Sequence, residues 1–255
     1  MRRLGWARVV AAVIGVGLAL APVGFRMFER APKGGDMIVG FRPYMKESKI
    51  GSFRAELATI GRAREEAATL PAQRQGTGAT ATFVRQWPSI DEDMGSMLRT
   101  MQHNIGHYDG VAALPPFRLF PWFFVIPGLL VAAVALFVRR PARWLAALAV
   151  GLLLAPAVFQ MFTRAPGGAR MIDGFRPFMT PAKVEKIQGY FLTIGGAEAD
   201  LRRDIVPAAP PSELPAVHSF IRQWPHISAD MAPMIGAMSD NVENFAAVDA
   251  LPPFG

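Results

Sequence analysis

Uncharged apolar runs alternate with long mixed segments along this chain. Three runs contain no charged residue: Val9–Phe25, Leu119–Val138 and Trp144–Phe162. A helix needs about 20 apolar residues to cross the hydrocarbon core of a bilayer. The second and third runs reach that length, and the first is somewhat shorter. The pattern predicts three transmembrane helices.

The first run also has features of a cleavable signal peptide. Met1–Arg3 is a basic start, and Ala19–Ala21 resembles a cleavage site. Pro22 would directly follow the cut, which is unfavourable for the peptidase. The same Ala-Pro pair recurs at Ala155–Pro156, in the middle of the chain, where no signal peptide can lie. We therefore interpret the first run as an uncleaved membrane anchor.

The mixed segments, 26–118 and 163–255, have helical periodicity. Apolar residues fall at helical spacing between Lys46 and Leu70, and again at Val184, Ile187, Phe191 and Ile194. Thr180–Pro181 is typical of a helix start. Short helices are expected over 82–87 and 216–224, and Pro88 and Pro225 are expected to end them. A capping box at Ser89–Glu92 then predicts a new helix that runs to about Ala113.

The two mixed segments resemble one another. Residues 21–45 match 155–179 at an offset of 134, with 16 identities in 25 positions. Further along, Phe83–Pro88 matches Phe220–Pro225 at an offset of 137. Asp93–Met94 and Leu114–Phe117 recur at the same offset, as Asp230–Met231 and Leu251–Phe254. Such self-similarity indicates an internal duplication.

The fold class is therefore an all-α membrane protein with three transmembrane helices and two homologous extracytoplasmic helical domains, a parallel internal duplication. Residues 1–25 form a short cytoplasmic N-terminus and the first span, and 26–118 the first helical domain. Residues 119–162 form a helical hairpin around a cytoplasmic loop at 139–143, and 163–255 the second domain. The C-terminus is then extracytoplasmic.

Charge supports this orientation. The formal net charge is +7, and six of the basic residues are arginines beside the apolar runs: Arg2, Arg3, Arg8, Arg139, Arg140 and Arg143. Arginine in short loops marks the cytoplasmic side. The segments 25–118 and 163–255 carry 13 basic against 10 acidic residues and 8 against 10. A nucleic-acid partner is not expected, because no basic face remains on the mixed segments.

Candidate functional residues come from motifs that occur in both segments. The Phe-Arg-Pro motif could place an arginine near lipid phosphate or at a helix C-terminus, and we favour a structural use. The candidate interaction or structural residues are Phe41, Arg42, Pro43, Arg85, Trp87, Asp93, Phe175, Arg176, Pro177, Arg222, Trp224 and Asp230. The methionines at 94, 97 and 101 form a helical stripe that we assign to the core rather than to a binding surface.

The sequence gives little support for disulfides, metal binding or catalysis. The chain has no cysteine, which excludes disulfides and thiolate sites. His103 and His107 stand four apart on the predicted helix, but a third ligand is not evident and the second segment lacks them, so no metal site is assigned. Asp93 and Asp230 supply one acid per segment rather than a catalytic pair. No catalytic residue and no cofactor is expected.

These patterns favour a non-enzymatic interaction, scaffold or accessory subunit of a bacterial envelope complex. Its expected partners are membrane lipid and other membrane or envelope proteins, or further copies of itself. One alternative is a ligand-sensing receptor without an output domain of its own, since the cytoplasmic parts are too short to hold one. Another is a transporter subunit, although the apolar runs carry no ionisable residue at depth.

Overall fold

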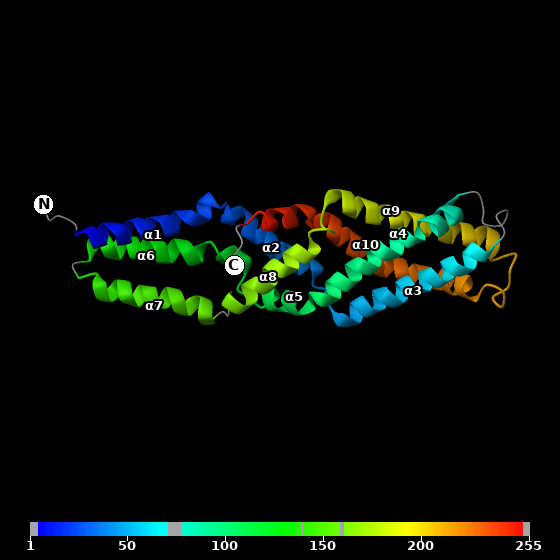
Figure 1. The fold of residues 1–255 in the computed structure, drawn as a ribbon, viewed down its shortest axis with the longest axis horizontal. Helices are drawn as coiled ribbons and strands as arrows, with labels where there is room; N and C mark the ends of the chain where they lie inside the picture. Colours follow the sequence, from blue (N-terminus) through cyan, green and yellow to red (C-terminus); the bar gives the residue numbers. More distant parts are fainter. Residues whose placement is uncertain (1–4, 71–77, 139, 159–160, 252–255) are drawn as a thin grey trace. The chain divides into compact units, whose positions relative to one another are not determined.

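The computed structural model describes residues 5–70, 78–138, 140–158 and 161–251. These residues form helices joined by turns, without a strand in the described ranges, so the prediction of an all-helical protein is confirmed (Figure 1). The helices are α1 (Trp6–Gly24), α2 (Met27–Phe41), α3 (Glu47–Thr69), α4 (Ala79–His103), α5 (Ile105–Ala112), α6 (Trp122–Phe137), α7 (Ala142–Val158), α8 (Met161–Phe175), α9 (Pro181–Asp200) and α10 (Pro215–Asp249), with a 3-10 turn at Phe117–Leu119 and a π-helical turn at Leu201–Ile205.

The chain divides into two compact units. The apolar-helix unit comprises Met1–Val39, Gly106–Ile172 and Glu243–Gly255. The four-helix unit comprises Gly40–Ile105 and Asp173–Val242. Each unit therefore combines residues from both mixed segments. The segment boundaries in the sequence do not indicate this division.

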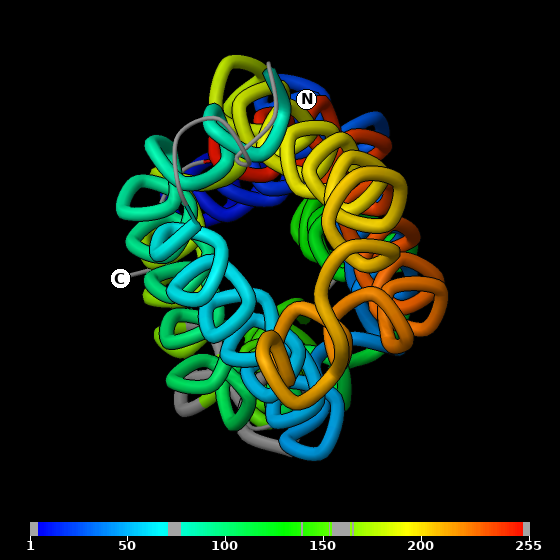
Figure 2. The backbone as a smooth tube through the Cα atoms, turned by 90° about the vertical axis from the view of Figure 1, so that its right-hand side faces the viewer, coloured from blue at the N-terminus to red at the C-terminus, as the bar shows by residue number. Residues whose placement is uncertain are grey.

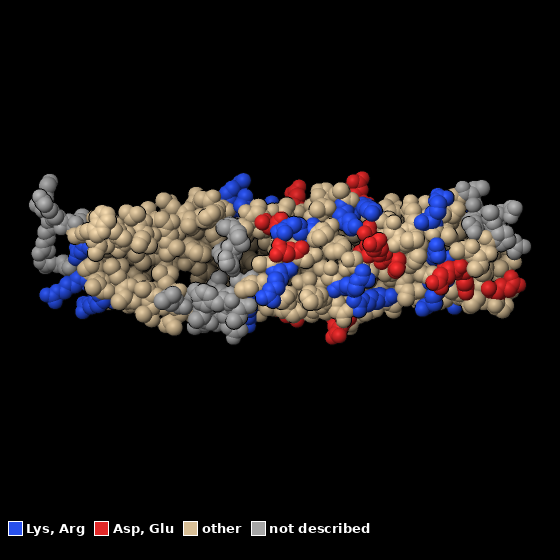
Figure 3. All heavy atoms as spheres, viewed as in Figure 1, with Lys and Arg blue, Asp and Glu red and all other residues tan. Residues whose placement is uncertain are grey.

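The apolar-helix unit contains two helices long and apolar enough to cross a membrane. They are Trp6–Gly24 and Phe117–Phe137, the latter including the 3-10 turn that leads into α6. The predicted third span overlaps α7, whose apolar stretch Ala142–Leu152 is shorter. Positions 159–160 of that span, together with Arg2, Arg3, Arg139 and the repeated residues 252–254, lie outside the described residues. On the face drawn in Figure 3, a long stretch of this unit shows no charged side chain, and arginine side chains gather at the end where α1 begins.

Helices α1 and α6 lie side by side and pack through small residues (Figure 1). A Cβ atom built on Gly15 would lie 2.6 Å from the amide nitrogen of Ala132, and one built on Gly128 would lie 2.6 Å from that of Ala19. The backbones thus approach too closely for a larger residue at either glycine. Ala12 is buried as well, whereas Val13 and Ile14 are exposed. Small residues at the contact and large apolar residues outside are the arrangement expected for helices packed in lipid.

The four-helix unit has a continuous apolar core between α3, α4, α9 and α10. Figure 1 shows these helices alongside one another, and the end view in Figure 2 shows α3 beside α4 and α9 beside α10. Most of the apolar positions that the periodicity places on one face are buried, among them Phe53, Ile60, Ile187 and Ile194, whereas Phe191 is half-buried. Met94, Met97 and Met101 are buried too, which confirms their assignment to the core.

Two predicted helix breaks are wrong. Helix α4 continues through Pro88, and α10 continues through Pro225 and Pro233. Ser89–Glu92 is therefore the middle of a helix rather than a capping box. A proline lacks the N–H that would bond the carbonyl four residues earlier, which for Pro88 is Val84 and for Pro225 is Ile221.

An arginine outside the interrupted helix supplies the missing donor in each case: Arg64 lies on α3, and Arg202 lies in the π-helical turn after α9. The Nε and Nη2 atoms of Arg64 donate to the carbonyl oxygen of Val84 at 3.3 and 3.1 Å. Arg202 donates through Nη2 to the carbonyl oxygen of Ile221 at 3.3 Å. The carbonyl that the proline leaves without a partner is thus hydrogen-bonded, and the helix can continue.

Other helix ends also differ from the prediction. The helix expected to run to Ala113 ends at His103, and α5 starts after Asn104. His103 and His107 therefore do not share one continuous helix, and the four-residue spacing loses its meaning as a metal motif. The expected start of α9 is confirmed, because the Thr180 side chain accepts a hydrogen bond from the Lys183 amide at 3.3 Å.

Candidate functional site

The two acidic residues that recur in the sequence each join one mixed segment to the other. The ammonium group of Lys49 lies 2.5 Å from Asp230, and that of Lys183 lies 2.6 Å from Asp93. Lys49 and Lys183 are 134 positions apart, the offset of the first matched stretch, while Asp93 and Asp230 follow the second offset of 137. The contacts are therefore reciprocal: the lysine of each segment pairs with the aspartate of the other.

Acidic caps repeat this reciprocity at the starts of α4 and α10. Glu66, at the end of α3, accepts hydrogen bonds from the amides of Ala216 and Val217 at 2.8 and 2.9 Å. Asp200, at the end of α9, accepts one from the Ala79 amide at 3.1 Å. A carboxylate at a helix N-terminus satisfies free N–H groups and interacts favourably with the helix dipole. Each segment therefore caps a helix of the other.

The glycine that precedes each Phe-Arg-Pro motif has a reciprocal contact too. A Cβ atom on Gly40 would lie 2.9 Å from the Asn241 amide nitrogen, and one on Gly174 would lie 3.0 Å from that of Asn104. Both asparagines are buried, and their amides donate to backbone carbonyls one turn earlier. The recurrent glycines thus make room for buried asparagines.

Around Asp93, donors outnumber acceptors. Lys183, Lys186 and the hydroxyl of Tyr190 all lie within hydrogen-bonding or ion-pair distance of its carboxylate, at 2.6, 3.1 and 3.0 Å. Partial burial by itself would raise the pKa of Asp93, but the hydrogen bonds from these three donors together outweigh it and lower the pKa. This cluster holds its single carboxylate ionised with two ammonium groups.

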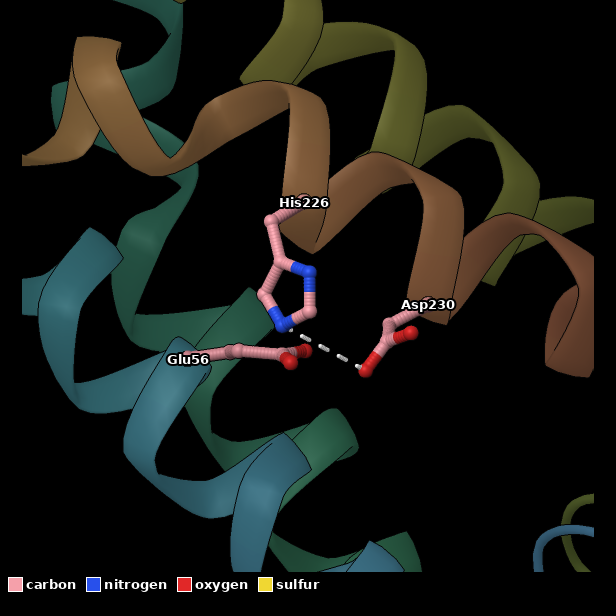
Figure 4. Close-up of side chains that lie close together, drawn as sticks. All are labelled: Glu56, His226 and Asp230. Carbon is pink, nitrogen blue, oxygen red and sulfur yellow. Dashed lines mark ion pairs between the residues drawn. The ribbon is translucent and has the colours of Figure 1, made fainter.

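The equivalent cluster around Asp230 has the opposite balance. Glu56 occupies the position that matches Tyr190, and Ser52 the position that matches Lys186. One cation, Lys49, therefore faces two carboxylates. His226 lies one helical turn before Asp230 on α10, with its Nε2 atom 3.9 Å from the Asp230 carboxylate. Figure 4 shows the side chains of Glu56, His226 and Asp230 directed toward one another from α3 and α10.

The Glu56 carboxyl group is the least satisfied member of this cluster. Its residue is 6% exposed, and its Oε1 atom accepts a hydrogen bond from Ser52 at 3.1 Å. Its Oε2 atom is buried and has no hydrogen-bond partner among the described residues. Burial raises the pKa of Glu56, with a smaller contribution from the charge of Asp230. The Lys49 hydrogen bond lowers the pKa of Asp230.

The cluster also has the composition of a metal site. Ligand atoms of Glu56, His226 and Asp230 all lie within 4.8 Å of one another, and they are the one such group found within the described ranges. Sequence spacing gives no sign of it, because Glu56 is distant along the chain. The recurrence of Asp93 as Asp230 marks one member of each cluster, but the sequence does not show which residues these aspartates meet.

The other residues singled out in the sequence serve packing or lie on the surface. Trp87 packs edge-on against Phe83, at 5.6 Å between ring centroids, and Trp224 packs in the same way against Phe220. Arg85 donates to Thr82 on its own helix. A final group lies in or near turns and on helix surfaces: Phe41, Arg42, Pro43, Phe175, Arg176, Pro177 and Arg222.

Comparison with known proteins adds no assignment. No protein-family model matches the chain, and neither a curated protein nor a solved structure matches it significantly.

Proposed function

We propose that this chain is a non-enzymatic integral membrane protein that acts as an interaction or scaffold subunit of a bacterial envelope complex. In this proposal a tandem duplication places two related helical segments outside the cytoplasmic membrane, where they fold together as the four-helix unit. Three spans anchor it, with the N-terminus in the cytoplasm and the C-terminus outside.

The observation that carries the proposal is the reciprocal pairing within the four-helix unit. Lys49 with Asp230 and Lys183 with Asp93 are related by the sequence offsets, as are the carboxylate caps at Glu66 and Asp200. These lysines and acidic residues are thus engaged in joining the segments. Side chains that form these ion pairs and helix caps are poorly placed for catalysis. A four-helix body held together in this way is suited to presenting a surface to a partner.

The membrane part of the proposal is supported by the packing of α1 against α6. Two apolar helices meet at Gly15 and Gly128, and their large apolar side chains lie exposed on other faces. Such side chains would be unfavourable in water and are favourable in hydrocarbon. The arginines beside the apolar runs support the orientation.

Cysteine labelling tests the topology, because the chain has no cysteine of its own. Ser48→Cys and Ala182→Cys are at matched, exposed positions of the two segments, and Arg140→Cys is in the connection before α7. A membrane-impermeant maleimide applied to intact spheroplasts should label the first two variants, and should label the third only after lysis. Labelling of Arg140→Cys in intact spheroplasts, or protection of either other variant, contradicts the proposed topology.

Native mass spectrometry tests the scaffold assignment. Full-length protein extracted from membranes in mild detergent should appear in a complex, either with a second envelope protein or with further copies of itself. Cross-linking in intact cells before extraction should capture the same species. A protein that is strictly monomeric in both experiments contradicts the proposal.

A further inference from the structure

The Asp230 cluster lacks a cation that its counterpart has. The same helical framework surrounds Asp93 with two ammonium groups and a phenol, and surrounds Asp230 with one ammonium group and a second carboxylate. With both carboxylates ionised, Glu56 and Asp230 carry one more negative charge than Lys49 neutralises. Burying an ionised carboxylate without a partner is costly. A divalent cation would balance both carboxylates.

The burial and bonding of Glu56 also point to a bound cation. Its residue is more than nine-tenths buried, and its carboxyl group is directed toward His226 and Asp230 (Figure 4). The Oε2 atom is buried and has no hydrogen-bond partner in the part of the chain that the structure describes. Buried polar atoms are nearly always satisfied, so each exception calls for an explanation such as a bound ion. The matching residue, Tyr190, uses its hydroxyl to bond Asp93 and leaves no such vacancy.

The donor set favours a first-row transition metal. It offers one imidazole nitrogen and two carboxylate oxygens, and His226 and Asp230 stand four residues apart on α10, a spacing that places both on one face of a helix. Imidazole favours Zn²⁺ and related ions, whereas Mg²⁺ and Ca²⁺ prefer oxygen ligands alone. Three protein ligands also leave a coordination position open for water.

The three ligand atoms must move somewhat closer together to bind one ion. The ligand atoms lie within 4.8 Å of one another. Around Zn²⁺, with bonds of about 2.0–2.2 Å, ligand atoms in a tetrahedral arrangement are about 3.4 Å apart. The His226 side chain is 73% exposed and has room to turn toward the carboxylates. The Lys49 side chain reaches Asp230 from the neighbouring helix and is flexible enough to leave it.

We infer that Glu56, His226 and Asp230 bind one divalent transition-metal ion of the Zn²⁺ or Co²⁺ type, which replaces the Lys49 ammonium group as the cation on Asp230. The ion fastens α3 to α10, and so joins the first mixed segment to the second at one of the two related positions. This inference does not depend on the proposed function, since the site lies within the four-helix unit.

Titration of the full-length protein tests the site. Tag-free protein in detergent, stripped with a chelator, is titrated with Zn²⁺ by calorimetry and with Co²⁺ by visible absorption. One ion per chain is expected, without comparable binding of Mg²⁺. Changing a residue that merely supports a metal ligand costs about 10–100-fold in affinity, so His226→Ala should weaken Zn²⁺ binding at least about tenfold.

Matched variants separate the site from adventitious binding. His103→Ala removes another exposed histidine of the same unit and should leave the affinity unchanged. Lys49→Met removes the competing cation and should strengthen binding. Glu56→Gln keeps the shape of the side chain and should weaken it. His226 is exposed, so its variant is expected to fold, and circular dichroism checks this.

Several results would overturn the inference. These are no stoichiometric Zn²⁺ binding by the wild-type chain, equal effects of His226→Ala and His103→Ala, or Mg²⁺ binding as tight as Zn²⁺ binding. Weaker binding by a folded Lys49→Met variant would also contradict it, because the ammonium group and the metal would then not compete.

Discussion

Arg64 is expected to stabilise the protein only because Pro88 interrupts the hydrogen bonding of α4. The proline removes the N–H that would bond the Val84 carbonyl, and the Arg64 guanidinium donates to that oxygen instead. Arg64→Ala leaves the carbonyl without this donor. Pro88→Ala restores the backbone N–H and should make the arginine dispensable. The two substitutions together form a double-mutant cycle.

The magnitude follows from the kind of bond that is lost. Leaving a partly buried carbonyl unsatisfied costs about 1–3 kcal/mol, and a hydrogen bond from a charged group contributes about 1.5–3 kcal/mol. Arg64→Ala should therefore destabilise the wild-type chain by about 1–3 kcal/mol, and the Pro88→Ala chain by less than about 0.5 kcal/mol. For a chain of this size, about 1 kcal/mol corresponds to about 2–4 °C in the melting temperature.

Thermal unfolding of the full-length protein in detergent measures the cycle. Tryptophan fluorescence is a suitable signal, since Trp87 precedes Pro88 and packs on Phe83 in the four-helix unit. Arg64→Ala should lower the melting temperature by about 2–12 °C. Arg62→Ala is the matched control, because Arg62 donates to Thr59 on its own helix and should change the melting temperature little.

The result that refutes this reasoning is equal destabilisation by Arg64→Ala in the two backgrounds. The arginine would then stabilise the protein through its other contacts, and the helix would tolerate Pro88 without an external donor. A Pro88→Ala variant less stable than the wild type would count against it as well. Arg202 and Pro225 provide an independent repeat of the experiment in α10.

Three further predictions concern glycines and one buried carboxyl group. Gly15→Val should destabilise the packing of α1 on α6 by about 1–3 kcal/mol, because the Cβ atom meets backbone that cannot yield. Gly17→Val should have little effect, since within the described residues nothing lies within 4 Å of its Cβ position. If Gly15→Val and Gly17→Val lower the melting temperature equally, the close approach of the backbones at Gly15 is not important for stability. Gly40→Ala should fail to stabilise α2, because its Cβ atom meets a buried asparagine amide. Gly51→Ala has open space in the described structure and should stabilise α3 by about 0.5–1 kcal/mol. A higher melting temperature for both variants would contradict this prediction. The pKa of Glu56 is raised above its ordinary value of 4.5, so ionisation disfavours the folded state as the pH rises above that value. With chelator present, Glu56→Gln should therefore be more stable than the wild type near pH 7 and converge with it below about pH 4.5; a constant difference in melting temperature from pH 4 to 7 would exclude ionisation of Glu56 as the cause.

Local patterns in the sequence were sufficient for the helical class and for much of the core. Most of the periodic apolar positions of α3 and α9 are buried, because a helix can bury one face only if its apolar residues recur at helical spacing. The start of α9 at Thr180 was predictable because its hydrogen bond spans only three residues. The three-span topology and the duplication stay predictions.

Features that depend on distant residues were decided by the tertiary structure alone. Proline predicts a break because its local effect is unfavourable, but a donor from elsewhere in the fold can offset that effect, as Arg64 does for Pro88. The recurrent aspartates were recognised from the sequence, but not the lysine that each one meets. The close approach of Glu56, on α3, to His226 and Asp230, on α10, has no sequence signature, because ligand geometry is a property of packed helices rather than of spacing along one of them.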